Sequence, residues 1–113
     1  MKDNRNIKVD FFGTEWTVRF VEKGVTMPDS EGKETWVAGR CNYEKRVIDV
    51  STKDSDNEPL PAKEIMITLL HELFHASLVS GQYLNSSGDE PLVEWLARST
   101  VKIIEALNKW NKK

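Results

Sequence analysis

Two histidines and a glutamate lie close together in the stretch LLHELFHA, residues 69–76. His71 and His75 are four residues apart, so on a helix both imidazoles leave the same face, one turn apart. Both can therefore reach one metal ion. Glu72 lies about 100° around such a helix from His71, which places its carboxylate beside the ion. From there it could take a proton from a water that the metal activates. The spacing is that of the HExxH pattern of zinc hydrolases.

Zinc fits this pair of histidines, because neutral imidazole is a good ligand for this ion. A hydrolytic zinc site needs three protein ligands and leaves the fourth position to water. The chain contains two histidines and both are already used. The third ligand must therefore be a carboxylate, and the stretch GDEPLVEWLA, residues 88–97, offers Glu90 and Glu94.

The choice between these two glutamates depends on the helix that they begin. On a helical wheel Glu90 falls with the core-facing residues, between Ala97 and Val101. Glu94 falls at the margin of that face, where it could simply be solvated. We therefore favour Glu90 as the third ligand and keep Glu94 as the alternative. An acidic residue in a first helical turn is also expected for the helix dipole alone.

The helix that carries the histidines is apolar around most of its circumference, so both histidines are expected in the interior. A buried pair without a metal would need hydrogen-bond partners, and the apolar neighbours cannot supply them. This disfavours the simpler reading of two core histidines. Pro61 is typical of a first helical position and Gly81 of a C-terminal cap, so the helix should span about 20 residues.

A second helix should begin near Asp89, whose side chain could cap its first turn. One broad face of this helix must pack on the first helix or on the sheet. That face is formed by Leu92, Val93, Leu96, Thr100, Ile103, Ile104, Leu107 and Trp110.

The residues before the helices predict strands. Residues 12–21 place Trp16, Val18 and Phe20 on one face, with the period of a half-buried strand. Residues 23–35 contain Gly, Pro, Asp and Ser without apolar periodicity and predict a long, mobile connection.

Residues 36–51 predict a hairpin with a first strand through Cys41, a turn at 42–45 and a second strand at 46–50. Gly39 in the first arm is typical of a bulge. The second strand could be an edge strand above the metal, where an extended peptide would add by backbone hydrogen bonding.

Two tyrosines could assist at such a site. Tyr43 lies in the hairpin turn and Tyr83 lies just past the first helix, and each is a possible donor to a developing oxyanion. Each also has a simpler reading as a surface or packing tyrosine.

Size and composition limit the remaining choices. The chain has 113 residues, enough for one domain, residues 1–113, and its 16 basic and 18 acidic residues form no basic stripe. Nucleic acid is therefore not expected as a partner. The single cysteine, Cys41, excludes an internal disulfide and fits a reducing compartment. No apolar run is long enough for a signal peptide or a membrane span, so we expect a cytoplasmic protein without membrane contact.

These elements together predict the α+β class: a small antiparallel sheet packed on a central HExxH helix, with a C-terminal helix that completes the metal site. The pattern resembles the small phage- and mobile-element-type HExxH metallopeptidases, which are distantly similar to the ImmA/IrrE group and to the minimal gluzincins. The resemblance rests on AGRCNYEKRVIDVS, ITLLHELFHASL and DEPLVEWLA. It implies His71, His75 and Glu90 on zinc, with Glu72 as the general base. Pro91, directly after the proposed ligand, departs from the pattern but is tolerated early in a helix.

The expected function is zinc-dependent hydrolysis of peptide bonds in a protein or peptide substrate. The resemblance to the ImmA group suggests cleavage of a repressor or another regulator. The alternative from another class is a catalytically silent zinc-containing binding or regulatory module of a phage or mobile element. A further alternative is a component that stays inactive until a partner protein binds it. Iron, cobalt or manganese can occupy similar ligands, and the residues leave the native metal and the oligomeric state open.

Overall fold

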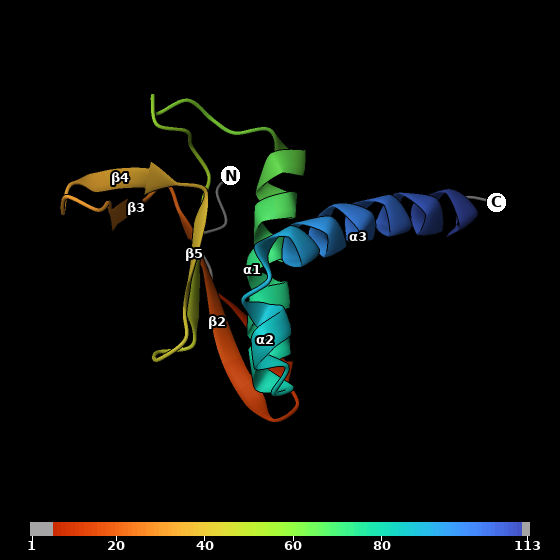
Figure 1. Ribbon diagram of the computed structural model, residues 1–113. Coiled ribbons are helices and arrows are strands. Elements are labelled where there is room, and N and C mark those ends of the chain that lie inside the picture. Colours follow the sequence, from red (N-terminus) through yellow and green to blue (C-terminus); the bar gives the residue numbers. More distant parts are fainter. Residues whose placement is uncertain (1–5, 112–113) are drawn as a thin grey trace.

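The protein folds into a small sheet and a hairpin followed by two long helices, and the α+β prediction is confirmed (Figure 1). The computed structural model describes residues 6–111, so the remaining ends of the predicted domain 1–113 lie outside the described residues. The elements are β1 (Ile7–Phe11), β2 (Thr14–Val21), β3 (Val25–Pro28), β4 (Glu34–Val37), β5 (Gly39–Asn42), β6 (Val47–Ser51), α1 (Ala62–Ser80), α2 (Leu84–Ser87) and α3 (Glu90–Asn111).

The main sheet has the order β1-β2-β6-β5. The strands β2 and β6 run parallel, with Thr17 opposite Val47 and Val21 opposite Ser51, and the other neighbours are antiparallel. The prediction of an antiparallel sheet was therefore wrong, because the chain crosses from β2 through three further strands before β6 returns alongside it. The same topology makes β6 a central strand. The prediction that residues 46–50 could form an edge strand was wrong, and the edge strands are β1 and β5.

The strand β1 was not predicted, because the turn that joins it to β2 lacks the usual residues. Phe12 and Gly13 both have positive φ, 56° and 87°, as the central residues of a two-residue hairpin turn do. A phenylalanine rarely adopts this conformation. The Gly13 backbone N–H donates to Asp10 Oδ1 at 2.7 Å, which supports the turn.

Residues 23–35 were predicted as a mobile connection, and this was wrong. They contribute to a separate hairpin in which β3 pairs with β4. Asp29 holds the turn between these strands, because its Oδ1 accepts hydrogen bonds from the backbone of Glu31 and Lys33 at 2.8 and 2.9 Å. The predicted first arm of the next hairpin is consequently divided at Ala38 into β4 and β5.

The pairing of β5 with β6 confirms the second part of that predicted hairpin. Gly39 does not form a simple bulge but starts β5 where the strand lies tightly against α1. A Cβ atom at Gly39 would lie 2.7 Å from Thr68 Cγ2 and 3.2 Å from Glu72 Cγ. Since real Cβ atoms do not approach this closely, glycine lets β5 pass directly over the helix.

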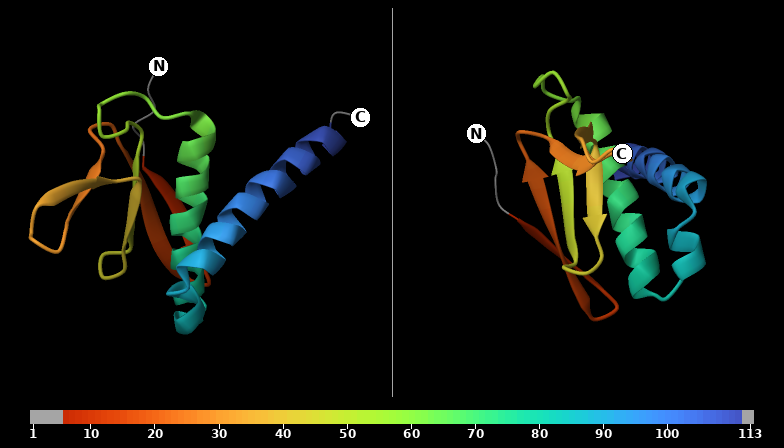
Figure 2. Two further views of the ribbon diagram at one scale, coloured as in Figure 1. Left: turned by 45° about the horizontal axis from the view of Figure 1, so that its top comes forward. Right: turned by 60° about the vertical axis from the view of Figure 1, so that its left-hand side comes forward.

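The core lies between α1 and one face of the main sheet (Figure 2). Its fully buried residues are Trp16, Val18, Ile48, Val50 and Ala76. The indole of Trp16 donates to Ser80 Oγ at 2.9 Å and so ties β2 to the last turn of α1. These contacts fix the rotation of α1 under the sheet.

The first helix has 19 residues and is capped by Gly81 as predicted. The Gly81 backbone N–H donates to Ser77 O at 2.9 Å, and the Gln82 backbone N–H donates to Val79 O at 3.0 Å. Pro61 precedes the helix rather than beginning it. The helix is less enclosed than predicted, since Met66 is 42% exposed.

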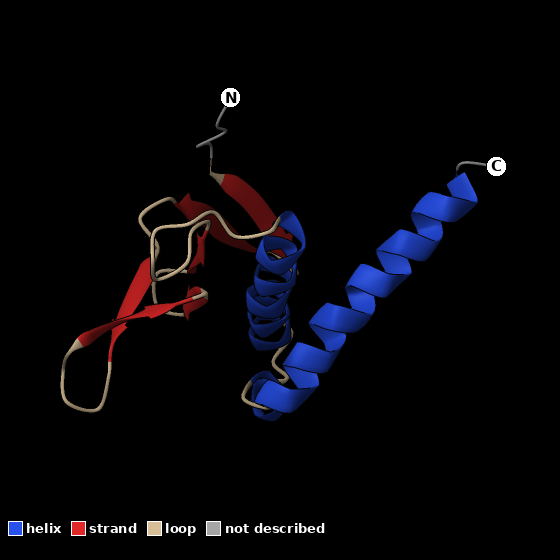
Figure 3. Ribbon diagram, turned by 90° about the horizontal axis from the view of Figure 1, so that it is seen from above, coloured by secondary structure: helices blue, strands red, loops and turns tan. Residues whose placement is uncertain are grey.

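The helix α3 begins beside Asp89, whose Oδ1 caps the backbone of Leu92 at 3.1 Å, as predicted. Its N-terminal half packs on α1 through Ala97 and Val101. The predicted packing of its whole apolar face was wrong, because α3 crosses α1 and then projects away from the body (Figure 3). Ile103, Leu107 and Trp110 are therefore exposed. None of the helices within residues 6–111 combines the length and apolar character needed to cross a membrane.

Candidate metal centre

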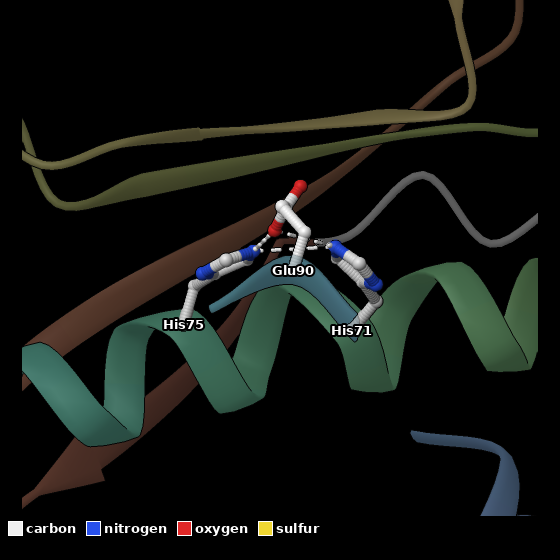
Figure 4. A group of neighbouring side chains, drawn as sticks. All are labelled: His71, His75 and Glu90. Carbon is white, nitrogen blue, oxygen red and sulfur yellow. Dashed lines mark hydrogen bonds and ion pairs between the residues drawn. The ribbon is translucent and has the colours of Figure 1, made fainter. Parts of the chain in front are cut away.

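Three predicted side chains converge where α3 begins above the middle of α1 (Figure 4). His71 and His75 extend from α1, and Glu90 is the first residue of α3. The Nε2 atoms of the two histidines lie 3.2 Å apart. Glu90 Oε1 lies 3.4 Å from His71 Nε2 and 2.5 Å from His75 Nε2. Three potential ligand atoms therefore surround one small volume.

This arrangement fits a metal ion. Tetrahedral zinc with ligands at about 2.0–2.1 Å separates any two ligand atoms by about 3.3 Å. Two of the three observed separations are close to that value, and the third, between Glu90 and His75, is shorter. His71, His75 and Glu90 could thus hold a metal ion, with all ligand atoms within 4.8 Å of one another.

Glu94 contacts the same histidine from the other side. Its Oε1 lies 2.8 Å from His71 Nδ1. A carboxylate can only accept, so Nδ1 carries the proton and Nε2 presents its lone pair to the metal position. Glu94 therefore does not compete with Glu90 for the metal position, and it is not simply a solvated surface residue, because it accepts a hydrogen bond from His71. The helical wheel could not show this, because it gives a direction on α3 but not the position of α1 beside it.

Arg98 holds Glu94 in turn, with Arg98 Nε 2.6 Å from Glu94 Oε2. Partial burial acts to raise the pKa of Glu94, but the hydrogen bonds from His71 and Arg98 outweigh it, so that the pKa is lowered. Glu94 therefore stays ionised and continues to accept from His71.

The three possible ligands differ in exposure. The side chains of His75 and His71 are 8% and 17% exposed, whereas that of Glu90 is 65% exposed. The histidines are enclosed largely as predicted, but Glu90 does not point into the core. His75 Nδ1 is buried and has no hydrogen-bond partner in the described part of the chain. The backbone of this residue is fixed instead, because Ser87 Oγ of α2 donates to His75 O at 3.2 Å.

The predicted base Glu72 is buried on the side of α1 that faces β5, with 9% exposure. Burial raises its pKa above the ordinary range, and the charge of Glu90 acts in the same direction, while His71 and His75 act against it. A carboxylate with a raised pKa is a better proton acceptor near neutral pH than an ordinary glutamate.

Two cavities of about 310 Å³ each meet at Glu72 and His71. The Glu64 cavity lies toward the N-terminal end of α1 and is lined, besides the metal centre, by Ala38, Gly39, Glu64, Ile67, Thr68 and Arg98. The Tyr43 cavity lies on the other side and is lined, besides the metal centre, by Met27, Gly39, Arg40, Cys41, Tyr43, Ser87 and Gly88. A bound chain could therefore extend in both directions from the centre.

Of the two tyrosines, Tyr43 lines its cavity beside His75 and Glu72. Tyr83 is 65% exposed and lines neither cavity. Cys41 lines the same cavity as Tyr43. Burial raises the pKa of its thiol to about 12, and the charge of Glu72 acts in the same direction, while a hydrogen bond with Tyr43 acts against both. Burial thus keeps the Cys41 thiol protonated at neutral pH, and a protonated thiol is a poor nucleophile.

The comparisons with known proteins add no relative: no protein-family model, no curated protein and no solved structure matches this chain.

Proposed function

We propose that this protein is a zinc-dependent metallopeptidase in which Glu72 is the general base. The observation that carries the proposal is the convergence of His71, His75 and Glu90 on one volume, with a buried carboxylate of raised pKa beside it. A group that only held a metal for stability would have no need of Glu72.

His71, His75 and Glu90 would hold the ion, and two imidazoles with one carboxylate are a donor set that zinc accepts well. Zinc in such a site supplies Lewis-acid chemistry, since it makes a water acidic near neutral pH and polarises a carbonyl group. Glu72 would accept the proton of the attacking water and deliver it to the leaving amine. Its burial keeps it free of competing solvent.

Tyr43 is the tyrosine placed to assist. Its ring stands in the cavity wall beside His75, where a hydroxyl could donate to the oxygen that gains charge during attack. Tyr83 has no such role in this proposal, because it lines neither cavity.

The substrate would be a protein or peptide segment in an extended form. The free edge of β5 borders both cavities through Gly39, and an extended chain can add to such an edge by backbone hydrogen bonds. The binding strand of the proposal is thus β5. We place the activity in the cytoplasm, because a single cysteine, which cannot form an internal disulfide, fits a reducing compartment.

The test compares wild type with Glu72→Gln for zinc content and for zinc-dependent cleavage of an unfolded, fluorescently labelled protein. We expect Glu72→Gln to retain zinc and to lose cleavage by about a hundredfold or more. Glu105→Gln is the control, because Glu105 lies on α3 and pairs with Lys63 and Lys102. Unchanged cleavage in Glu72→Gln would refute the assigned base. Zinc binding by wild type without cleavage would support the silent module, and cleavage only with an added partner would support partner control.

A further inference from the structure

The Glu64 cavity, at about 310 Å³, has room for one long side chain. Its walls are the short or apolar residues Ala38, Gly39, Ile67 and Thr68. Gly39 has no side chain and lies tightly over Thr68, so at this position β5 borders the pocket with its backbone alone. The pocket opens directly beside Glu72 and His71. A side chain next to the cleaved bond could therefore enter it.

The charges around this pocket do not cancel. Glu94 and Arg98 form an ion pair at 2.6 Å and neutralise each other. Glu72 lines the pocket together with His71, whereas Glu90 lies outside it. A divalent cation held by the candidate centre would offset the charges of both carboxylates. Among the described residues around this pocket, the charge of Glu64 is the one that remains without a partner. Glu64 is exposed, and none of the described cations forms an ion pair with it.

The neighbouring lysine does not compensate for Glu64. Lys63 Nζ is directed instead to Glu105 of α3, at 3.8 Å. Glu64 occupies the first turn of α1, where the helix dipole favours an acidic residue. The helix dipole explains why an acidic residue stabilises this turn. It does not explain why the acidic residue lies at the wall of the pocket, which Glu64 lines.

We propose that the Glu64 cavity receives a basic side chain of the substrate, lysine or arginine, and that Glu64 is the residue that selects it. The aliphatic part of the side chain would lie against Ile67 and Thr68, and its cation would meet the Glu64 carboxylate. An acidic side chain is disfavoured, because the cation of Arg98 is already paired with Glu94. This inference rests on the proposed peptidase function, since it names the residue beside the cleaved bond.

The test measures binding rather than turnover. The probes are pairs of short hydroxamates, which bind zinc directly and carry either lysine or its uncharged analogue norleucine. One series places this side chain before the hydroxamate and the other places it after, because only one of these directions leads into the Glu64 cavity. Affinities for the zinc-loaded protein are measured by calorimetry at low salt.

In one series we expect wild type to bind the lysine probe about fivefold more tightly than the norleucine probe, as for a partly exposed ion pair. Glu64→Gln should make the two affinities equal, and Glu64→Lys should reverse their order. Glu31→Gln, at the tip of the β3–β4 hairpin, is the matched control and should retain the preference. The melting temperature of each variant shows whether folding is preserved.

Equal affinity of both probes in both series, or a preference that survives Glu64→Gln, would overturn the inference. The outcome is separable from that of the proposed function. A lysine preference lost in Glu64→Gln supports the pocket even if no peptide is cleaved. Cleavage that depends on Glu72 but shows no preference for basic residues would leave the peptidase proposal standing and refute the role of Glu64.

Discussion

His71 is held between two carboxylates that lie one turn apart on α3. Glu90 faces its Nε2 at 3.4 Å, and Glu94 accepts from its Nδ1 at 2.8 Å. The second contact fixes the tautomer and the ring orientation before any metal binds, which also raises the basicity of the ligand nitrogen. From the sequence, Glu90 and Glu94 were alternatives for the third metal ligand. In the structure they contact different nitrogens of His71, Glu90 lying near Nε2 and Glu94 bonded to Nδ1.

The first prediction concerns this positioning role. Glu94→Ala should weaken zinc binding by about 10- to 100-fold, because such a carboxylate orients the ligand without touching the metal. The measurement is a competition titration against a chelator of known affinity. Glu105→Ala serves as the control on the same helix. If Glu94→Ala and Glu105→Ala bind zinc equally well, Glu94 does not position His71.

At the scale of elements, Asp49 joins three strands on the sheet face away from α1. The Asp49 side chain is 3% exposed. Its Oδ1 forms an ion pair with Arg19 Nε of β2 at 2.7 Å, and its Oδ2 forms one with Arg40 Nη2 of β5 at 2.8 Å. Arg40 also reaches Thr26 O of β3 at 3.5 Å. This cluster fixes β5, the strand that borders the candidate active site. Burial acts to raise the pKa of Asp49. The hydrogen bonds and charges of both arginines outweigh burial, so the pKa is lowered.

A carboxylate whose pKa is lowered in the folded state stabilises the fold above its unfolded pKa. Asp49→Asn should therefore destabilise the protein at pH 7, by about 2 kcal/mol, since both arginines are partly exposed. The difference in unfolding free energy between wild type and Asp49→Asn should shrink once the pH falls below about 4, the unfolded pKa. It should continue to shrink until the pH has passed the lowered pKa of Asp49 in the folded protein. Urea unfolding at several pH values measures this, with the exposed Asp56→Asn as control. A destabilisation that is constant from pH 7 to pH 3 would contradict the assignment.

The elements differ in how far the sequence could predict them. Gly81 and Asp89 mark helix ends by local chemistry, and both positions were predicted correctly. The parallel pairing of β2 with β6 depends on contacts some 30 residues apart in sequence, such as Thr17 with Val47, and no local pattern reports it. The turn at Phe12 was missed because its backbone conformation is unusual for that residue. These two errors arose because long-range pairing or an unusual turn decides the fold there.

At the scale of the whole molecule, the metal position joins the two helices. The candidate ligands come from α1 and α3, which otherwise pack through a small cluster that includes Ile67, Ala97 and Val101. A metal bound by both helices would stabilise this packing, because ligands that bind only the folded state raise its stability. The helical spacing of the histidines made their convergence predictable. The sequence also predicted that the C-terminal helix supplies Glu90 to the site. It did not predict where α3 crosses α1 (Figure 3), since the crossing depends on the path of the chain through α2.

The most direct measurement of the central claim is the zinc content and melting temperature of the purified protein. We predict one zinc ion per chain in wild type, removal of that ion by a chelator with a lower melting temperature, and recovery of both on adding zinc. The variant that combines His71→Ala with His75→Ala should contain no bound zinc and should not respond to the metal. A wild-type protein that binds no stoichiometric zinc, or a double variant that retains it, would contradict the account.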